Sequence, residues 1–145
     1  AYDGNWLTDE LVESIKDMPI WFTHSANDNT VSIYEKEGDG WFTPITPTNP
    51  QNAYTNNLYV RLINAGAANV HYSLFESVLV DGVNYDGHWS WIYMLRDECI
   101  NVQPTQGKDG GELTISDLDP ASQEKVEIDG EAVSLWAWLA AQSKA

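Results

Sequence analysis

The chain has 145 residues, of which 43% are hydrophobic, which favours one packed domain over general disorder. It carries 22 acidic against 7 basic residues, and the resulting net charge of −15 argues against binding to nucleic acid or to an anionic membrane surface. No apolar run approaches the roughly 20 residues of a membrane span. A single cysteine, Cys99, excludes an internal disulfide and a CxxC metal or redox site.

The acidity fits two interpretations. A solvated surface is the simpler one, and adaptation to salt or a preference for cationic ligands is the other. The chain does not open with a basic stretch followed by an apolar core, so no signal peptide is predicted. A mature secreted chain has the same appearance.

The first predicted elements are a helix over residues 6–17 and a strand over residues 19–23. Thr8 is a candidate cap of the helix, in which leucine and isoleucine recur at spacings of four. The run that begins at Pro19 is almost continuously apolar, which is typical of a strand buried on both faces. A polar loop over residues 24–29 is expected at its carboxyl end, where open α/β sheets form their sites.

The middle of the chain predicts a loop, a helix and a second strand. Residues 35–51 hold several glycines and prolines, which forbid long regular elements. Residues 53–65 place tyrosine, leucine and alanine on one helical side, and Gly66 follows as a stop. Residues 70–78 alternate between two faces, with Val70, Tyr72 and Leu74 on one and His71 and Ser73 on the other, which indicates a strand.

The remaining third is rich in turn residues. Residues 81–87 are expected to connect to a helix that starts within residues 89–98. Residues 101–130 are polar and acidic, with a possible short strand pair near residues 113–118. Residues 132–141, rich in alanine, leucine and tryptophan, predict a closing helix.

This order of elements predicts an α/β fold. Strands separated by helices pair in parallel and form a βαβ unit. Two parallel strands do not make a stable sheet alone, because both faces and both edges need cover. The sequence therefore predicts a sheet from which further strands are missing.

His88 and Asp28 are the residues most suited to catalysis. His88 directly follows a glycine, in a loop after the second predicted strand, and the pKa of histidine near neutrality fits proton transfer. Asp28 stands in the loop after the first strand, where a carboxylate can hold the tautomer of an imidazole and stabilise its cation. Asp followed by His, each after a strand, is the order of the last two members of the Ser-Asp-His triad of α/β-hydrolases.

The other candidate groups favour structural roles. His24 is expected to end its strand hydrogen-bonded to the backbone, and His71 to lie at a surface or edge. Cys99 is expected to be a small buried side chain. An EF-hand starting near Asp117 lacks the required glycine and glutamate, and we expect no metal and no cofactor.

Three tryptophans are expected to lie in a buried strand or a packed helix, and three others are free to line a cleft. The first group contains Trp21, Trp136 and Trp138, and the second contains Trp41, Trp89 and Trp91.

Four segments together resemble the C-terminal part of an α/β-hydrolase, of the kind that includes secreted esterases, polyester depolymerases and prolyl-oligopeptidase-like enzymes. They occur in the family's order. The segments are residues 16–24 with Asp28 and Val31, similar to the acid strand and loop; residues 62–70, similar to the following helix-to-strand junction; residues 87–91, similar to the histidine loop; and residues 135–142, similar to the final helix.

The resemblance implies that Asp28 is the triad acid and His88 the triad base. Ser25 and Asn29 depart from the family, which commonly has glycine and proline there. Residues 35–51 and 101–130 have the character of insertions. None of the serines stands in the Gly-x-Ser-x-Gly elbow that exposes the nucleophile of these enzymes.

Residues 1–145 are therefore expected to form a single segment, the C-terminal half of an α/β-hydrolase domain. The expected function is that of a serine hydrolase acting on carboxylic esters, with a serine peptidase of the same fold as one alternative. The nucleophile and the missing strands would come from an N-terminal half in a separate chain, and the chain alone would be inactive. A small ester or peptide is the expected substrate.

A second alternative is a hydrolase-like binding module that has lost catalysis and uses its exposed aromatic side chains for ligands. The compartment stays open: the absence of disulfides permits the cytoplasm, whereas the resemblance favours secretion.

Overall fold

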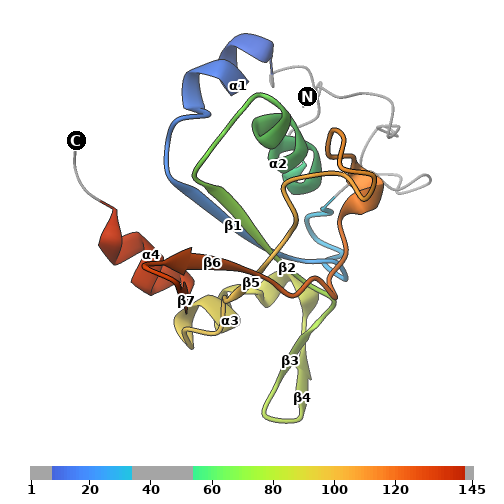
Figure 1. The fold of residues 1–145 in the computed structure, drawn as a ribbon. Coiled ribbons are helices and arrows are strands. Elements are labelled where there is room, and N and C mark those ends of the chain that lie inside the picture. The colour runs from blue at the N-terminus through green and yellow to red at the C-terminus, as the bar shows by residue number, and fades with distance from the viewer. Residues whose placement is uncertain (1–7, 34–53, 143–145) are drawn as a thin grey trace.

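A parallel pair of strands forms the centre of the computed structural model, which describes residues 8–33 and 54–142 (Figure 1). Of the described strand pairings, only this one is parallel. The elements in chain order are α1 (Asp9–Ile15), β1 (Ile20–Ser25), α2 (Thr55–Asn64), β2 (Val70–Phe75), β3 (Val78–Val80), β4 (Val83–Tyr85), the 3₁₀ helix η1 (Gly87–Trp89), α3 (Trp91–Leu95), β5 (Asn101–Val102), the 3₁₀ helix η2 (Ile115–Asp117), β6 (Glu124–Ile128), β7 (Glu131–Val133) and α4 (Leu135–Ala141).

Strands β1 and β2 run parallel, which confirms the predicted pairing. Their register runs from Ile20 opposite Val70 to Ser25 opposite Phe75. The first strand is longer than predicted: His24 and Ser25, expected to open a polar loop, belong to β1. Their backbone groups complete the pairing with β2. Both side chains have partners in the loop that follows, and His24 also contacts Thr55 of α2.

The two faces of this strand pair are covered differently. One face packs against α1 and α2 in a cluster of buried side chains that includes Val12, Tyr59 and Tyr72. The other face carries Trp21, which packs with Trp138 of α4 against the short sheet β5–β6–β7. Because both faces of the strand pair are covered, side chains that point to either face of β1 and β2 contribute to the core.

The helices are shorter than the predicted ranges. The helix expected over residues 6–17 is α1, which begins after Thr8, whose hydroxyl accepts a hydrogen bond from the N–H of Leu11 at 3.2 Å. Helix α2 ends before Gly66, whose φ of +96° is a conformation that glycine adopts readily. Parts of both predicted ranges, and the predicted loop and insertion over residues 35–51, lie outside the described residues.

Two β-hairpins were not predicted. The strand expected over residues 70–78 ends at Phe75, and β3 then pairs with β4 across Asp81 and Gly82, whose φ angles are 52° and 79°. Strands β6 and β7 join in the same way across Asp129 and Gly130, with φ angles of 53° and 81°. Both are Asp-Gly pairs in the left-handed region, which two-residue hairpin turns require.

The prediction of a strand pair near residues 113–118 is wrong. That segment contains η2, whose N-cap Thr114 exchanges hydrogen bonds with Asp117 in a capping box. The strands of this region are β5 and β6, which pair antiparallel. The N–H of Gln103, just after β5, donates to the carbonyl of Tyr72 in β2 at 2.8 Å and so attaches this sheet to the parallel pair.

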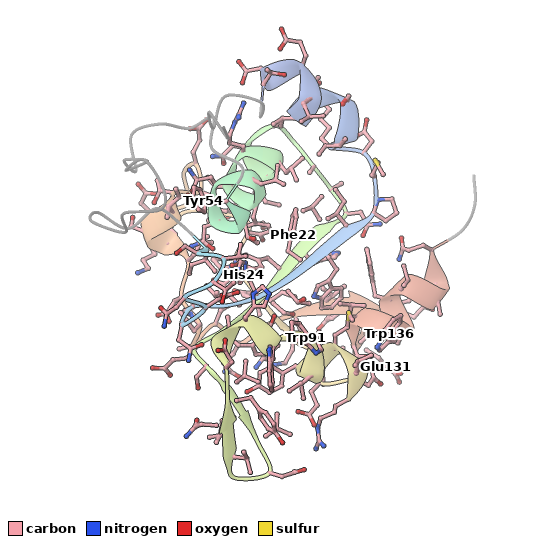
Figure 2. All side chains as sticks on the ribbon, turned by 180° about the vertical axis from the view of Figure 1, so that it is seen from behind. Phe22, His24, Tyr54, Trp91, Glu131 and Trp136 are labelled. Carbon is pink, nitrogen blue, oxygen red and sulfur yellow. The ribbon has the colours of Figure 1, made fainter. Side chains whose placement is uncertain are left out.

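The last two predicted helices are also shorter in the structure. The segment 89–98 divides into the end of η1 and the single-turn α3, and the segment 132–141 starts with the end of β7 before α4 begins. Trp138 is buried as expected, but Trp136 is exposed and donates its indole N–H to the carbonyl of Met94 at 2.6 Å (Figure 2). None of the described helices is long and apolar enough to cross a bilayer.

His71, predicted at a surface or edge, lies in the two-stranded sheet β1–β2 and is partly buried. Its ring lies 5.3 Å from the ring of Trp21 and 5.4 Å from that of Trp138, so it is part of the aromatic packing behind β2. Burial lowers the pKa of His71 from 6.5 to about 4. The imidazole is therefore neutral at neutral pH.

The pH dependence of stability tests this environment. The unfolded chain protonates His71 below about pH 6.5, whereas the folded chain keeps it neutral down to about pH 4, so the free energy of unfolding falls as the pH drops through this window. We expect His71→Phe, which keeps an aromatic ring between the two tryptophans, to lose less stability between pH 7 and pH 4.5 than the natural chain. Urea unfolding at both pH values measures the difference, and equal losses would contradict this environment.

Candidate active site

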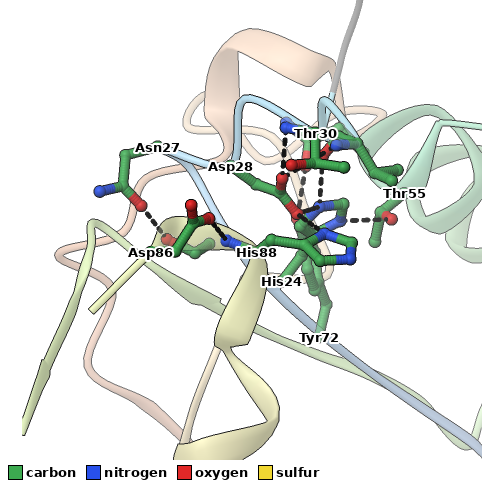
Figure 3. Close-up of polar contacts among 11 residues, drawn as sticks. His24, Asn27, Asp28, Thr30, Thr55, Tyr72, Asp86 and His88 are labelled. Atoms are coloured by element: carbon green, nitrogen blue, oxygen red, sulfur yellow. Dashed lines mark hydrogen bonds and ion pairs between the residues drawn. The ribbon is translucent and has the colours of Figure 1, made fainter.

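Asp28 is held in a tight turn directly after β1. Its N–H donates to the carbonyl of Ser25 at 3.2 Å, and its Oδ1 accepts the N–H groups of Thr30 and Val31, both at 2.9 Å (Figure 3). The Asp28 side chain is only 4% exposed. A buried carboxylate is costly unless its oxygens are hydrogen-bonded, and the turn supplies two backbone donors to one of them.

His88 reaches Asp28 from η1, which follows β2 and the hairpin β3–β4 along the chain. The Oδ1 of Asp86 accepts the N–H of His88 at 2.9 Å and so begins the 3₁₀ turn. The Nδ1 of His88 lies 3.1 Å from the Oδ2 of Asp28, across 60 residues of sequence. The structure thus brings together the two residues that the sequence singled out.

Gly87 allows the histidine loop to approach the acid loop closely. A β-carbon at this position would lie 2.6 Å from both the carbonyl carbon and the carbonyl oxygen of Asn27. The contact is with backbone, which cannot rotate away as a flexible side chain can. The glycine before His88 is therefore required by the packing of one loop on the other.

The hydrogen-bond partners assign the protons of His88. Asp28, when ionised, only accepts hydrogen bonds, so Nδ1 of His88 is the donor and Nε2 carries the lone pair in the neutral ring. The side chain is 39% exposed, and among the described residues no group is hydrogen-bonded to Nε2. The ring of Trp91 lies edge-on at 5.7 Å. This is the tautomer that a general base needs in order to accept a proton at Nε2.

Asp28 is ionised at neutral pH. Burial raises the pKa of its carboxyl group, but the hydrogen bonds from Val31, His88 and Thr30 and the electrostatic influence of His24 outweigh burial and lower the pKa below its ordinary value. The anion can therefore stabilise a positive charge on His88. A protonated Asp28 would lose this ability.

His24 is a member of the cluster that sequence reasoning missed. The predicted bond to backbone is confirmed, because Nε2 lies 2.8 Å from the carbonyl oxygen of Val31. The same nitrogen also lies 3.1 Å from the Oδ2 of Asp28, and Nδ1 lies 2.8 Å from the hydroxyl of Thr55 in α2. The sequence signal was present in the four-residue spacing of His24 and Asp28, but the extension of β1 to Ser25 was needed to interpret it.

Exposed aromatic rings continue outward from His88. The ring of Trp91 lies 6.1 Å from that of Trp89, which in turn lies 6.1 Å from Tyr85 of β4. All three side chains are exposed, as expected for the two tryptophans, and Figure 2 labels Trp91 on α3. Trp41, the third tryptophan expected to line a cleft, lies outside the described residues.

Cys99 is buried, as predicted. Burial, with the nearby carboxylates of Asp97 and Glu98, raises the pKa of its thiol to about 12. At neutral pH the sulfur is therefore a protonated thiol, which is a poor nucleophile.

Comparisons with protein-family models, with curated proteins and with solved structures found no match for this chain. The site is therefore described by its own geometry: a buried carboxylate that binds two imidazoles, one of which presents a nitrogen lone pair toward solvent.

Replacing Gly87 tests the close approach of the two loops. We expect Gly87→Ala to lower the free energy of unfolding by about 1–3 kcal/mol, as overpacking does, and to move His88 away from Asp28. Urea unfolding measures the first effect, and the imidazole signals of His88 in nuclear magnetic resonance spectra measure the second. Gly111→Ala is the control, since its β-carbon would meet only the side chain of Asp109, at 3.2 Å. A Gly87→Ala chain that is as stable as the control would contradict the packing argument.

Proposed function

We propose that this chain supplies the acid and the base of a serine hydrolase whose nucleophile comes from another polypeptide segment. One observation carries the proposal: Nδ1 of His88 is hydrogen-bonded to the buried Asp28, while the side chain is 39% exposed and Nε2 has no hydrogen-bond partner among residues 8–33 and 54–142. In a triad, Nε2 is the atom that binds the hydroxyl of the nucleophilic serine. The resemblance of four segments to α/β-hydrolases supports the same assignment.

The proposed reaction uses His88 twice. A serine oxygen bonds to the carbonyl carbon of an ester while Nε2 of His88 takes the serine proton. His88 then gives this proton to the departing alcohol, which leaves an acyl-serine. A water molecule attacks the acyl group, with His88 again accepting and then returning a proton, and the carboxylic acid is released. Asp28 stabilises the imidazolium form of His88 in both halves of the reaction.

The serine of this reaction belongs to an N-terminal half of the same domain. No serine of the chain lies within a Gly-x-Ser-x-Gly elbow. Within residues 8–33 and 54–142, β1 and β2 are the only strands that pair in parallel, and two such strands are few for a stable sheet, which supports the need for further strands. Carboxylic esters are the proposed substrates because the resemblance favours secreted esterases, and a peptide substrate is the alternative within the same mechanism.

The test is to purify the chain together with any companion polypeptide and to assay hydrolysis of a short acyl ester. We expect hydrolysis only with a companion present, and we expect a fluorophosphonate label to react with a serine of the companion. Hydrolysis by the chain alone, or a label on one of its own serines, would contradict the proposal.

Substitutions in the reconstituted enzyme test the two roles. We expect Asp28→Asn to reduce kcat about ten-thousand-fold, because an amide favours the wrong tautomer of His88 and cannot stabilise the imidazolium, and His88→Ala to reduce it at least as far. Asp81→Asn is the matched control, since this carboxylate lies in the turn of the hairpin β3–β4, is exposed and pairs with Arg96 at the end of α3. Full activity of His88→Ala would remove the proposed role of His88.

A non-catalytic binding module is the second candidate, and the exposed row of Tyr85, Trp89 and Trp91 favours it. Such a row can stack on a sugar or another flat ligand without any nucleophile. The mass of the purified species distinguishes the two: a monomer without companion favours the binding module, whereas a companion with a Gly-x-Ser-x-Gly segment favours the hydrolase.

A further inference from the structure

Two imidazole rings share one oxygen of Asp28. The Nε2 of His24 and the Nδ1 of His88 each lie 3.1 Å from Oδ2, while Oδ1 is occupied by the N–H groups of Thr30 and Val31 (Figure 3). The proposed mechanism uses only His88. His24 is therefore a buried imidazole in contact with the triad acid and without an assigned role.

The protonation of His24 follows from its partners. The carbonyl oxygen of Val31 only accepts, so Nε2 of His24 carries a proton, which it shares between this carbonyl and Asp28. In the neutral ring Nδ1 then accepts the hydroxyl proton of Thr55, at 2.8 Å. His24 and His88 are thus expected to be opposite tautomers: His24 carries its proton on Nε2 and His88 carries its proton on Nδ1.

The position of His24 gives it a fixed orientation. It lies in β1, its side chain is 10% exposed, and its two nitrogens are held by α2 on one side and by the loop after β1 on the other. His88, in contrast, is 39% exposed and lies in a three-residue 3₁₀ turn. His24, with its fixed orientation, therefore holds the Oδ2 atom of Asp28 to which the more exposed His88 is bonded.

We propose that His24 is a positioning residue that acts through Asp28 to limit the basicity of His88. The proposal depends on the catalytic role proposed for His88. A second donor on Oδ2 draws on the same negative charge that stabilises the His88 imidazolium, so the carboxylate stabilises that cation less than it would alone. A less basic His88 returns its proton more readily to the leaving alcohol.

Two further titratable side chains, Asp86 and Tyr72, are drawn with the pair in Figure 3. Asp86 faces His88 from the start of η1 and accepts its backbone N–H. Tyr72 of β2 donates its hydroxyl to Asn56 at 2.7 Å, and burial raises its pKa well above the ordinary value, so it stays neutral. Thr55 of α2 does not titrate. A change at His24 leaves the carboxyl groups of Asp28 and Asp86 in place.

The test is a titration of the His88 ring in the full, ¹⁵N-histidine-labelled chain by nuclear magnetic resonance, with signals assigned through a His88→Gln chain. His24→Leu removes the donor to Asp28, and we expect it to raise the pKa of His88 by about 0.5–1 pH unit. His24→Gln is the matched control because its amide nitrogen can still donate from a similar position, and we expect a shift of less than about 0.3 unit. An unchanged or lowered pKa in a folded His24→Leu chain overturns the proposal.

A measurement on the natural chain covers the case in which His24→Leu does not fold. At pH 8 the ¹⁵N shifts of the rings report the tautomers, and we expect the proton of His24 on Nε2. A proton on Nδ1 of His24 would mean that it donates nothing to Asp28, which overturns the proposal. Neither readout needs a companion or an ester. The hydrolase proposal is judged by activity and serine labelling, whereas the role of His24 is judged by the nuclear magnetic resonance measurements, so the failure of one is distinguishable from the failure of the other.

Discussion

Six residues of β1 lie parallel to six residues of β2, and the loops that leave these strands therefore start at the same edge of the sheet. This arrangement is what brings Asp28, in the turn after β1, within reach of His88, in the 3₁₀ turn that follows β2 and the hairpin. An antiparallel pair would send the two loops to opposite ends. Gly87 completes the approach, because only a residue without a β-carbon fits against the backbone of Asn27.

The site also depends on the cost of burying a charge. Asp28 is ionised although it is buried, and its two oxygens face four donors: two backbone N–H groups, His24 and His88. Backbone donors come with the turn itself and need no further element. The two imidazoles come from β1 and from η1, so a single carboxylate links the strand, the acid loop and the histidine loop.

The three histidines have different environments and therefore different properties. His71 packs between two tryptophans, where burial lowers its pKa to about 4 and keeps it neutral. His24 is enclosed between Thr55, Val31 and Asp28, and each of its nitrogens has a partner. His88 alone is both bound to a carboxylate and half exposed, with a nitrogen directed away from the protein groups that hold it. The proposed division of labour, one base and one positioning residue on the same acid, follows from these environments.

Local patterns were enough to predict the apolar run of β1 and the alternation within β2, because each depends on neighbouring residues. The order strand, helix, strand predicted their parallel pairing, and the position of Asp28 and His88 after these strands made them candidates. The two Asp-Gly hairpin turns had the same local signal, although the sequence was interpreted there only as turn-rich. The extent of β1, the burial of His71 and the exposure of Trp136 depended on partners that the sequence does not place. The contact of His24 with Thr55 spans 31 residues and that of Asp28 with His88 spans 60, so which donors meet the carboxylate was decided only when the strands paired and the loops packed together.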